Sequence, residues 1–299
     1  MSNSPTAVSE ETTQAAGGSR KRAPGDWRSL TLLLPAVLVI TVFFVVPLID
    51  IFQRSFTDPT PGIQNYIWIV TNESAVGVLI RTFVVSFIVT IVTLILAYPY
   101  AYLMTIVGDK GRSVLTLFIM LPLWTSILVR TLAWFVLLQD TGPINDLIQA
   151  MGFDPVPLIR TPFGVALGMT QVLLPFMVLP LYSAMAKIDK RLLPAAASLG
   201  AHPLVAFWKI YLPLSRPGIF AGGITVFILG LGFYIIPALL GSPKETMVSA
   251  LIYLQVSQFL EWGRGTALGI FLLVITIFLL WLVSKLAKGT SIFPGVEKK

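Results

Sequence analysis

Six long stretches of this chain contain no charged residue, and this spacing of charges constrains the fold more than any other feature. The uncharged runs cover residues 29–49, 82–108, 113–129, 161–186, 217–243 and 265–284. An α-helix needs about 20 apolar residues to cross a bilayer, so five of the runs are long enough by themselves. The third run is short, but residues 131–139 continue it as an apolar segment beyond Arg130. The pattern predicts an all-α membrane protein with six transmembrane helices.

The composition agrees with a chain that lies in a bilayer. Hydrophobic residues make up 56% of the chain and charged residues 12%, which is about half the charged fraction of an average globular domain. A soluble domain of this size would have too few charges to cover its surface. The chain contains no cysteine, which excludes a disulfide framework and a thiolate metal site.

The basic residues predict the orientation in the membrane. If the N-terminus is cytoplasmic, the segments on the inner side hold 15 Lys and Arg residues and those on the outer side hold 5. This is the asymmetry of the positive-inside rule, and it places both termini in the cytoplasm. The net charge of +7 is then a consequence of topology, and no nucleic-acid partner is expected.

The distribution of polar and apolar residues divides the chain into three predicted segments. Residues 1–28 are rich in Ser, Thr, Ala and Gly and are expected to form a disordered cytoplasmic tail, because they bury too little apolar surface to fold. Residues 29–286 form the predicted six-helix domain, and residues 287–299 form a second cytoplasmic tail. The first apolar run is long and has no obvious cleavage site, so it is expected to stay as a helix.

The segment 186–217, between the fourth and fifth runs, carries small residues and a closing Leu-Pro at fixed spacing. Two alanines are followed after three residues by glycine, after nine more by isoleucine, and after one further residue by Leu-Pro. This pattern resembles the EAA loop of binding-protein-dependent ABC importer permeases, and Pro217-Gly218-Ile219 follows it as in that family. The residues assigned to this ATPase-coupling loop are Ala195, Ala196, Gly200, Ala201, Ile210, Leu212 and Pro213.

The resemblance covers about residues 27–290 and implies a type I ABC importer permease fold in the bacterial inner membrane. It implies four kinds of partner besides the lipid bilayer: a second permease subunit (a paralogue or a copy), two ATPase subunits, and a periplasmic or extracellular substrate-binding protein. The chain has no G-x-x-x-x-G-K-[ST] loop and a single histidine, His202. It is therefore expected to be no enzyme and to bind no cofactor or metal, with ATP and Mg used by the partner ATPase.

The local sequence of the loop predicts two short helices. Asp189 is a plausible N-cap for a helix that runs to Ser198, and Gly200 follows where such a helix ends. A second short helix is expected over Leu204–Tyr211. The glutamate of the family pattern aligns with Pro194, which has no charge. Nearby Lys190 and Arg191 are candidates to compensate for it.

Two other regions resemble the spermidine/putrescine-type branch of the family. One is the third apolar run around Arg130, the only charge inside a predicted span. The other follows the fifth helix, from Phe233 to Lys244. Arg130 has two interpretations that the sequence leaves open, a site on the pathway or subunit interface and a structural arginine. The candidate translocation-pathway residues are Trp124, Arg130, Trp134, Tyr234 and Pro237.

The expected substrate is a small organic solute, with a polyamine such as spermidine or putrescine favoured. No intramembrane carboxylate is available to pair with an ammonium group, but aromatic faces attract cations. The alternatives are import of another small organic solute, such as an amino-acid-like compound or a phosphonate, and a secondary transporter or channel subunit. A secondary transporter would need ion-coupling acids or broken helices in paired halves.

Overall fold

The computed structural model describes residues 34–35 and 37–287, and its regular structure in that range is entirely helical. The tail predicted for residues 1–28 lies outside the described residues, as does the C-terminal tail apart from Ala287, which ends the last helix. Five helices are long and apolar enough to cross a membrane. They are Val37–Thr57, Glu73–Ile106 (α4), Pro162–Met185 (α8), Pro203–Leu231 and Trp262–Leu282.

The remaining span is a pair of helices that meet at a sharp bend. Asp109–Trp124 and Ile127–Leu137 pass the same test together and are bent by 94°, so the described part of the chain has six spans if the pair counts as one. This agrees with the predicted number. The first pair member comprises α5 (Asp109–Met120) and the 3₁₀ turn η2 (Leu121–Trp124), and the second is α6 (Ile127–Leu137).

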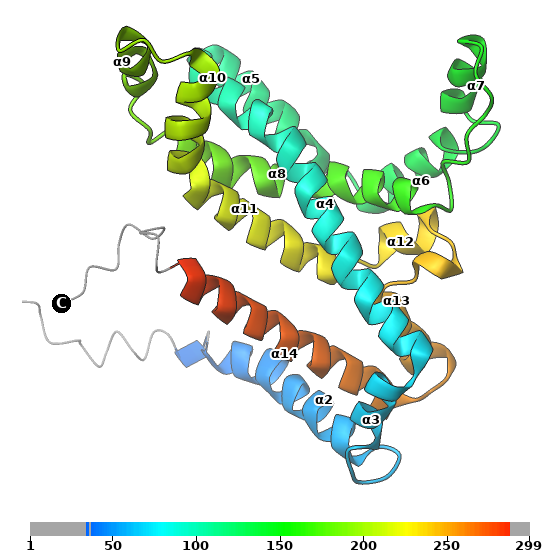
Figure 1. Cartoon of the computed structure of the whole chain (residues 1–299). Coiled ribbons are helices and arrows are strands. Elements are labelled where there is room, and N and C mark those ends of the chain that lie inside the picture. The colour runs from blue at the N-terminus through cyan, green and yellow to red at the C-terminus, as the bar shows by residue number, and fades with distance from the viewer. Residues whose placement is uncertain (1–33, 36, 288–299) are drawn as a thin grey trace, which may run out of the picture. The chain divides into compact units, whose positions relative to one another are not determined.

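Several spans are built from more than one element, and shorter helices connect them (Figure 1). The span Val37–Thr57 includes η1 (Thr41–Val45) and α2 (Val46–Thr57). The span Pro203–Leu231 includes α10 (Pro203–Ala206), η3 (Phe207–Tyr211) and α11 (Leu212–Leu231). The last span belongs to α14, which runs over Trp262–Ala287. The connecting helices are α3 (Gln64–Thr71), α7 (Pro143–Ala150), α9 (Leu192–Ser198), α12 (Ile235–Leu240), η4 (Pro243–Glu245), α13 (Val248–Tyr253) and η5 (Leu254–Gln258).

The chain divides after Ile49 into two compact units, and the core lies in the unit from Asp50 onward. There α4, α8 and α11 pack against one another. Of the candidate spans, α8 has the largest buried share, 61% of its most apolar window. Gly218 and Gly222 on α11 allow this packing: a Cβ at Gly218 would lie 2.7 Å from the Ala184 Cβ, and one at Gly222 would lie 2.7 Å from the Met177 Sδ. Small residues at these positions let the backbones of α8 and α11 approach closely.

The bend in the third span has a local cause in the backbone. Pro122 has no N–H to donate to the preceding turn, and Thr125 and Ser126 are extended, with ψ of 147° and 130°. A new helix then begins at Ile127. The sequence showed one apolar run continued beyond Arg130, and it contained no signal for the size of this bend.

The fifth span begins and ends earlier than the uncharged run 217–243 suggests. Its helix starts at Pro203, and it ends at Leu231. Gly232 and Phe233 are not helical, and α12 begins at Ile235. The part of the run after Gly232 therefore belongs to a connecting segment.

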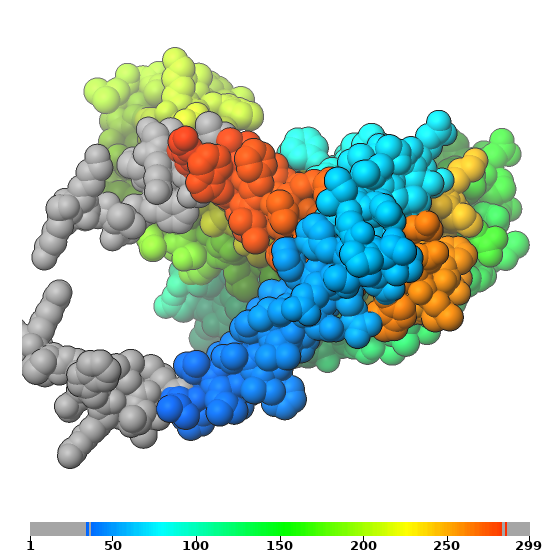
Figure 2. All heavy atoms as spheres, turned by 90° about the horizontal axis from the view of Figure 1, so that it is seen from below, coloured from blue at the N-terminus to red at the C-terminus, as the bar shows by residue number. Residues whose placement is uncertain are grey.

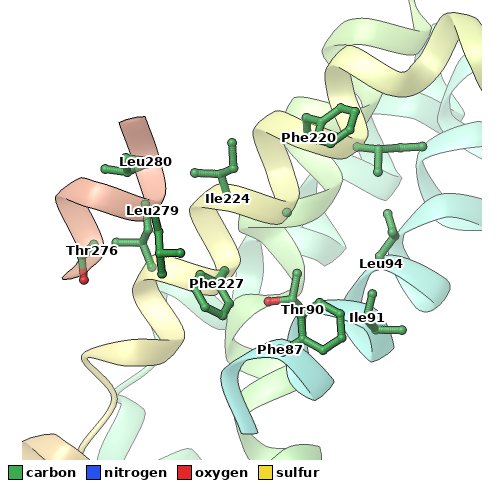
Figure 3. Close-up of a pocket in the computed structure, with 13 residues that line it drawn as sticks. Phe87, Thr90, Ile91, Leu94, Phe220, Ile224, Phe227, Thr276, Leu279 and Leu280 are labelled. Carbon is green, nitrogen blue, oxygen red and sulfur yellow. The ribbon is translucent and has the colours of Figure 1, made fainter. Parts of the chain in front are cut away.

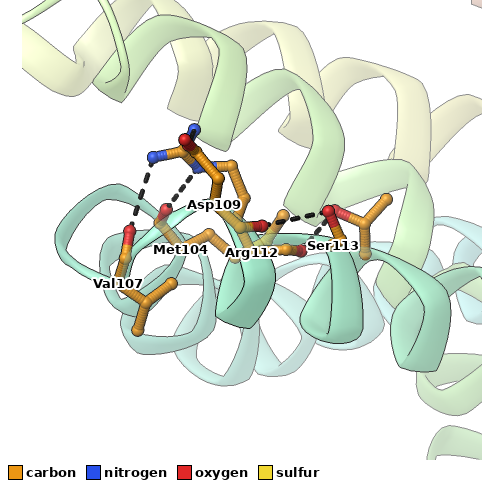
Figure 4. A network of polar contacts seen from close by, with 6 residues as sticks. Met104, Val107, Asp109, Arg112 and Ser113 are labelled. Carbon is orange, nitrogen blue, oxygen red and sulfur yellow. Dashed lines mark hydrogen bonds and ion pairs between the residues drawn. The ribbon is translucent and has the colours of Figure 1, made fainter.

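Arg112 closes the tight connection between α4 and α5 (Figure 4). Its Nε and Nη2 donate to the carbonyl oxygens of Met104 and Val107 at 3.2 and 3.4 Å, and its Nη1 pairs with an Asp109 carboxylate oxygen at 2.9 Å. The last carbonyls of a helix have no partner within the helix. Arg112 satisfies two of these groups and fixes the turn next to the loop described below.

Short helices lie at two ends of the unit that begins at Asp50. Figures 1 and 2 show α9 and α10, in yellow-green, at one end, and α7, in green, at the opposite end. The two ends are separated because α7 precedes α8 in the chain and α9 follows it, so they lie at opposite ends of α8. This arrangement leaves the segment 186–217 at one end of the bundle and the α6–α8 connection at the other.

Candidate functional site

The predicted coupling loop contains a helix that ends in a complete Schellman turn. Gly200 has a left-handed backbone, with φ of 84°. Its N–H donates to the Ala197 carbonyl at 2.9 Å, and the Ala201 N–H donates to the Ala196 carbonyl at 3.0 Å. These two bonds satisfy carbonyls that the end of α9 would otherwise leave unpaired. The pattern glycine thus ends α9 as predicted.

The beginning of α9 differs from the prediction. Asp189 does not cap the helix: its Oδ1 accepts from the Arg191 backbone N–H at 2.9 Å, and α9 begins at Leu192 with Arg191 at the N-cap position. The carboxylate instead fixes the turn that precedes the helix. Pro194 lies in the first turn of α9, where proline removes no helical hydrogen bond.

The second predicted short helix is not separate from the fifth span. Pro203–Leu231 forms one continuous helical stretch, and residues Phe207–Tyr211 within it are a π-helix in which the Leu212 N–H donates to the Phe207 carbonyl. Pro213 has no N–H for the Lys209 carbonyl, so the regular α-helical ladder is interrupted at this point. π-helical turns occur frequently at functional sites.

Aromatic rings join this π-helix to α4. The Phe207 ring lies 5.8 Å from the Tyr98 ring and 6.3 Å from the Tyr102 ring, both edge-on, and Tyr211 lies 5.2 Å from Tyr102. The Tyr98 hydroxyl also bonds to the Ser215 hydroxyl at 2.9 Å. Such aromatic pairs add to the energy of simple burial. The last part of the loop, Phe207–Tyr211, is therefore packed against α4.

The seven residues assigned to the coupling loop occupy one continuous part of the structure. Ala196 is buried, whereas Ala195 and Gly200 are exposed. Ala201, Ile210, Leu212 and Pro213 are half-buried. The first residues thus belong to α9 and its turn, and the last three connect η3 to α11.

Arg130 lies on α6 immediately after the bend of the third span. Its Nη2 donates to the Thr125 carbonyl at 3.4 Å, a group that the break leaves without a helical partner. Its Nε and Nη1 are buried and have no acceptor within the described residues. Trp124, on the other side of the bend, is 73% exposed. Arg130 thus contacts the bend through one nitrogen and has two nitrogens without an acceptor in the described residues, so both interpretations stand as predictions.

Trp134, one turn further along α6, is held by a polar residue of α8. Its indole Nε1 donates to the Gln171 Oε1 at 3.1 Å. Gln171 was not among the residues predicted from the sequence, although it is an amide within the uncharged run 161–186. The bond orients the Trp134 ring between the two helices.

Tyr234 and Pro237 line a pocket of about 400 Å³ at the start of α12. The Tyr234 ring lies 5.5 Å from the ring of Tyr253 on α13, which also lines the pocket together with Gln258. Tyr253 was not among the predicted residues, because it lies in a separate segment further along the chain. The pocket offers aromatic faces, hydroxyls and an amide to a small polar solute.

The structure does not gather all five pathway candidates in one cavity. Tyr234 and Pro237 share the pocket, whereas Arg130 and Trp134 lie on α6, which packs against α12. A different pocket, of about 450 Å³, lies between α4, α11 and α14 (Figure 3). Phe87, Phe220, Phe227 and aliphatic side chains make most of its lining. It offers too few polar groups to replace the hydration of a charged solute.

The described helices include five candidate membrane spans, or six if the bent pair is one span, which is the architecture of a multi-pass membrane protein. Comparison with known proteins gives its family. The family described as "Binding-protein-dependent transport system inner membrane component" matches residues 97–292. The chain therefore belongs to this family, and it is a multi-pass inner-membrane subunit of an ABC importer.

Two relatives and one solved structure agree with the family. The spermidine/putrescine transport system permease protein PotB of Haemophilus influenzae is 33% identical over 258 residues, covering 86% of this chain and 88% of the relative. PotB of Escherichia coli is 31% identical over 265 residues, covering 87% and 94%. The crystal structure of a bacterial alginate ABC transporter in complex with an alginate pentasaccharide-bound periplasmic protein has a TM-score of 0.71 at 22% identity, covering 88% of this chain and 94% of that one.

These comparisons confirm the resemblance stated from the sequence and the importer permease fold. Membrane subunits of this family are not enzymes and bind no cofactor, since ATP is used by the separate ATPase. The family assignment also excludes the alternative that the chain is a secondary transporter or channel subunit. It leaves the substrate and the roles of individual residues to the proposals below.

Proposed function

We propose that this chain is one of two permease subunits that together form a pathway for a polyamine, with spermidine and putrescine as the first candidates. The observation that carries the proposal is the similarity to two PotB proteins over 86% and 87% of the chain. The aromatic pair Tyr234–Tyr253 supports it, because aromatic faces attract ammonium groups without a carboxylate.

The solute passes along the side of the bundle that carries Trp134, Tyr234 and Pro237. Tyr234 presents its ring at the pocket beside α12, and Trp134 is oriented by Gln171 on α8. Trp124 is exposed next to the bend and is available to the solute or to the second permease. Arg130 supports the bend through the Thr125 carbonyl rather than binding a polycation, which its own charge would repel.

The loop from Ala195 to Pro213 transmits force from the ATPase. The Schellman turn at Gly200 fixes the end of α9, and Phe207 and Tyr211 connect the segment to α4. Movement of the loop therefore moves α4 and α11 with it. ATP binding in two partner ATPases rotates the loops and opens the pathway outward, an external binding protein delivers solute, and hydrolysis resets the pair.

This mechanism requires the loop and both termini to lie in the cytoplasm. The excess of basic residues in the segments expected inside, 15 against 5, supports this orientation. The end of the unit that carries α7 then faces outward. The pocket of Tyr234 lies in a connection on that same outer side, where a binding protein releases solute.

The experiment that tests the substrate is uptake of labelled spermidine and putrescine by cells that lack this chain, with and without its gene restored. We expect uptake to be lost and to return on restoration. The same cells are given labelled amino acids and a phosphonate, the other solute classes that the sequence leaves open. Unchanged polyamine uptake, in cells without a second polyamine importer, would reject the polyamine and retain the permease.

A further inference from the structure

An apolar groove of about 470 Å³ lies between α3, α4 and α14, which contact one another (Figure 1). Val76, Ile80 and Val84 line it from α4, and Phe271 and Ile275 line it from α14. It follows α4 for about 12 Å, since each helical residue advances 1.5 Å. Ile80 is 60% exposed and Val84 49%, so the groove is open along its side. Because α4 and α14 are candidate spans, this opening faces the bilayer or another membrane subunit.

Each of the two spans carries one charged residue two turns before the groove. Glu73 precedes Ile80 on α4 by seven residues, and Arg264 precedes Phe271 on α14 by seven. A spacing of seven places residues on one face of a helix, about 10 Å apart. Both helices begin beside α3: α4 follows it directly in the chain, and the Arg264 guanidinium lies 5.1 Å from the Trp68 ring of α3. The two charges therefore lie at the same end of the groove, which we call its mouth.

Both charges at the mouth are accessible to a ligand. The Arg264 Nη1 lies 3.6 Å from a Glu261 carboxylate oxygen, which is longer than a hydrogen bond. Glu73 is exposed and makes no ion pair within the described residues. An acid in the first turn of a helix and a cation over an aromatic ring both occur without a ligand. Here they coincide with an open apolar groove, and this combination matches a molecule with a charged head and an apolar tail.

The surface of α3 indicates that the mouth lies at the level of the lipid headgroups. Ile63, Ile67 and Val70 are exposed and follow one face at spacings of four and three residues, the period of a helical stripe. α3 connects two candidate spans, and Trp68 is a residue type enriched at membrane–water interfaces. A short helix with such a stripe binds to the surface of a bilayer. The groove then runs from the headgroups into the hydrocarbon.

We propose that this groove binds one molecule of phosphatidylethanolamine, with its phosphate at Arg264, its ammonium at Glu73 and one acyl chain along Ile80 and Val84. A guanidinium forms strong charge-assisted hydrogen bonds with phosphate, and a carboxylate does so with an ammonium group. A purely anionic headgroup would lie beside Glu73 and Glu261, which repel it. A helix of the second permease would need neither charge at the mouth. The site is separate from the pocket of the proposed pathway and adds a lipid to the transporter.

The test titrates phosphatidylethanolamine into the assembled, delipidated transporter in detergent and counts bound lipid by native mass spectrometry. Arg264→Gln removes the phosphate partner, and Ile80→Trp fills the groove. Each is expected to weaken binding of one lipid about tenfold or more, because hydrogen bonds to charged groups contribute this much. The matched controls are Arg160→Gln, at an exposed arginine before α8, and Ile95→Trp, at a 64% exposed position of α4 outside the groove. Both should bind the lipid normally.

The headgroup is tested with phosphatidylglycerol, which has a phosphate but no ammonium. The unchanged transporter is expected to prefer phosphatidylethanolamine at least threefold, and Glu73→Gln should remove this preference. Equal or stronger binding of phosphatidylglycerol by the unchanged transporter would overturn the proposal, as would normal binding by Arg264→Gln or by Ile80→Trp. Release of the second permease by Ile80→Trp would also overturn it, because the groove would then be a contact between subunits.

Discussion

Gly200 is the residue whose identity the backbone restricts most in the coupling loop. Its φ of 84° lies in the region that side chains with a Cβ rarely adopt. There is open space around it, since a Cβ added at this position would have no neighbouring atom within 4 Å. Backbone strain, rather than a steric contact, therefore decides which residues this position accepts.

Replacing this glycine gives a prediction with an internal control. Gly200→Val is expected to reduce transport at least tenfold while leaving membrane insertion intact, because a left-handed backbone costs about 1–2 kcal/mol for an ordinary residue and more for a β-branched one. Gly200→Asn should keep most of the activity, since asparagine tolerates this conformation. Uptake and the amount of chain in the membrane are both measured. Normal uptake by the valine variant would contradict the role of this turn.

At the scale of elements, the contact between α8 and α11 depends on glycines that face α8. A Cβ at Gly218 would lie 3.0 Å from the Leu181 Cα and 3.1 Å from the Pro180 carbonyl oxygen. Both atoms belong to the backbone, so they cannot turn away as a side chain would. Gly223 points elsewhere, and a Cβ there would meet only the Thr90 Cγ2, at 3.9 Å.

These two glycines form a matched pair for a stability measurement. Gly218→Ala is expected to destabilise the packed bundle by about 1–3 kcal/mol, because the helices must move apart. Gly223→Ala should be neutral or slightly stabilising, because alanine favours a helix by up to about 1 kcal/mol over glycine. The midpoint of thermal unfolding in detergent is compared for both. A lower midpoint for Gly223→Ala alone would show that the helices pack differently.

For the whole molecule, orientation is the property on which the proposed mechanism depends. The chain has no cysteine, so a single introduced thiol can be labelled without background. Asp154 and Ser198 are both exposed and lie in the connections at the two opposite ends.

Asp154→Cys is expected to react with a membrane-impermeant maleimide in intact cells with a permeabilised outer membrane. Ser198→Cys should react only after the inner membrane is opened. The basis is the threefold excess of basic residues in the segments assigned to the inside. The reverse labelling pattern would place the coupling loop outside and remove the proposed contact with an ATPase.

Much of the fold of this protein could be predicted from its sequence because a bilayer requires long apolar segments. The uncharged runs predicted the number of spans, since a charge inside lipid is costly. The spacing from Ala195 to Pro213 predicted the loop and its family, and Gly200 predicted the end of α9. Here the local sequence contains the physical cause, either the polarity of a segment or the conformation of one residue.

Other features were decided only by the tertiary structure. Helices that are apolar on all sides carry little information about which face is buried, so the sequence did not indicate that Gln171 meets Trp134 or that Tyr253 joins Tyr234. The 94° bend and the early end of the fifth helix lie within apolar runs, where polarity does not change at the break. Composition determined which segments enter the membrane, and packing between distant segments determined where they bend and which side chains meet.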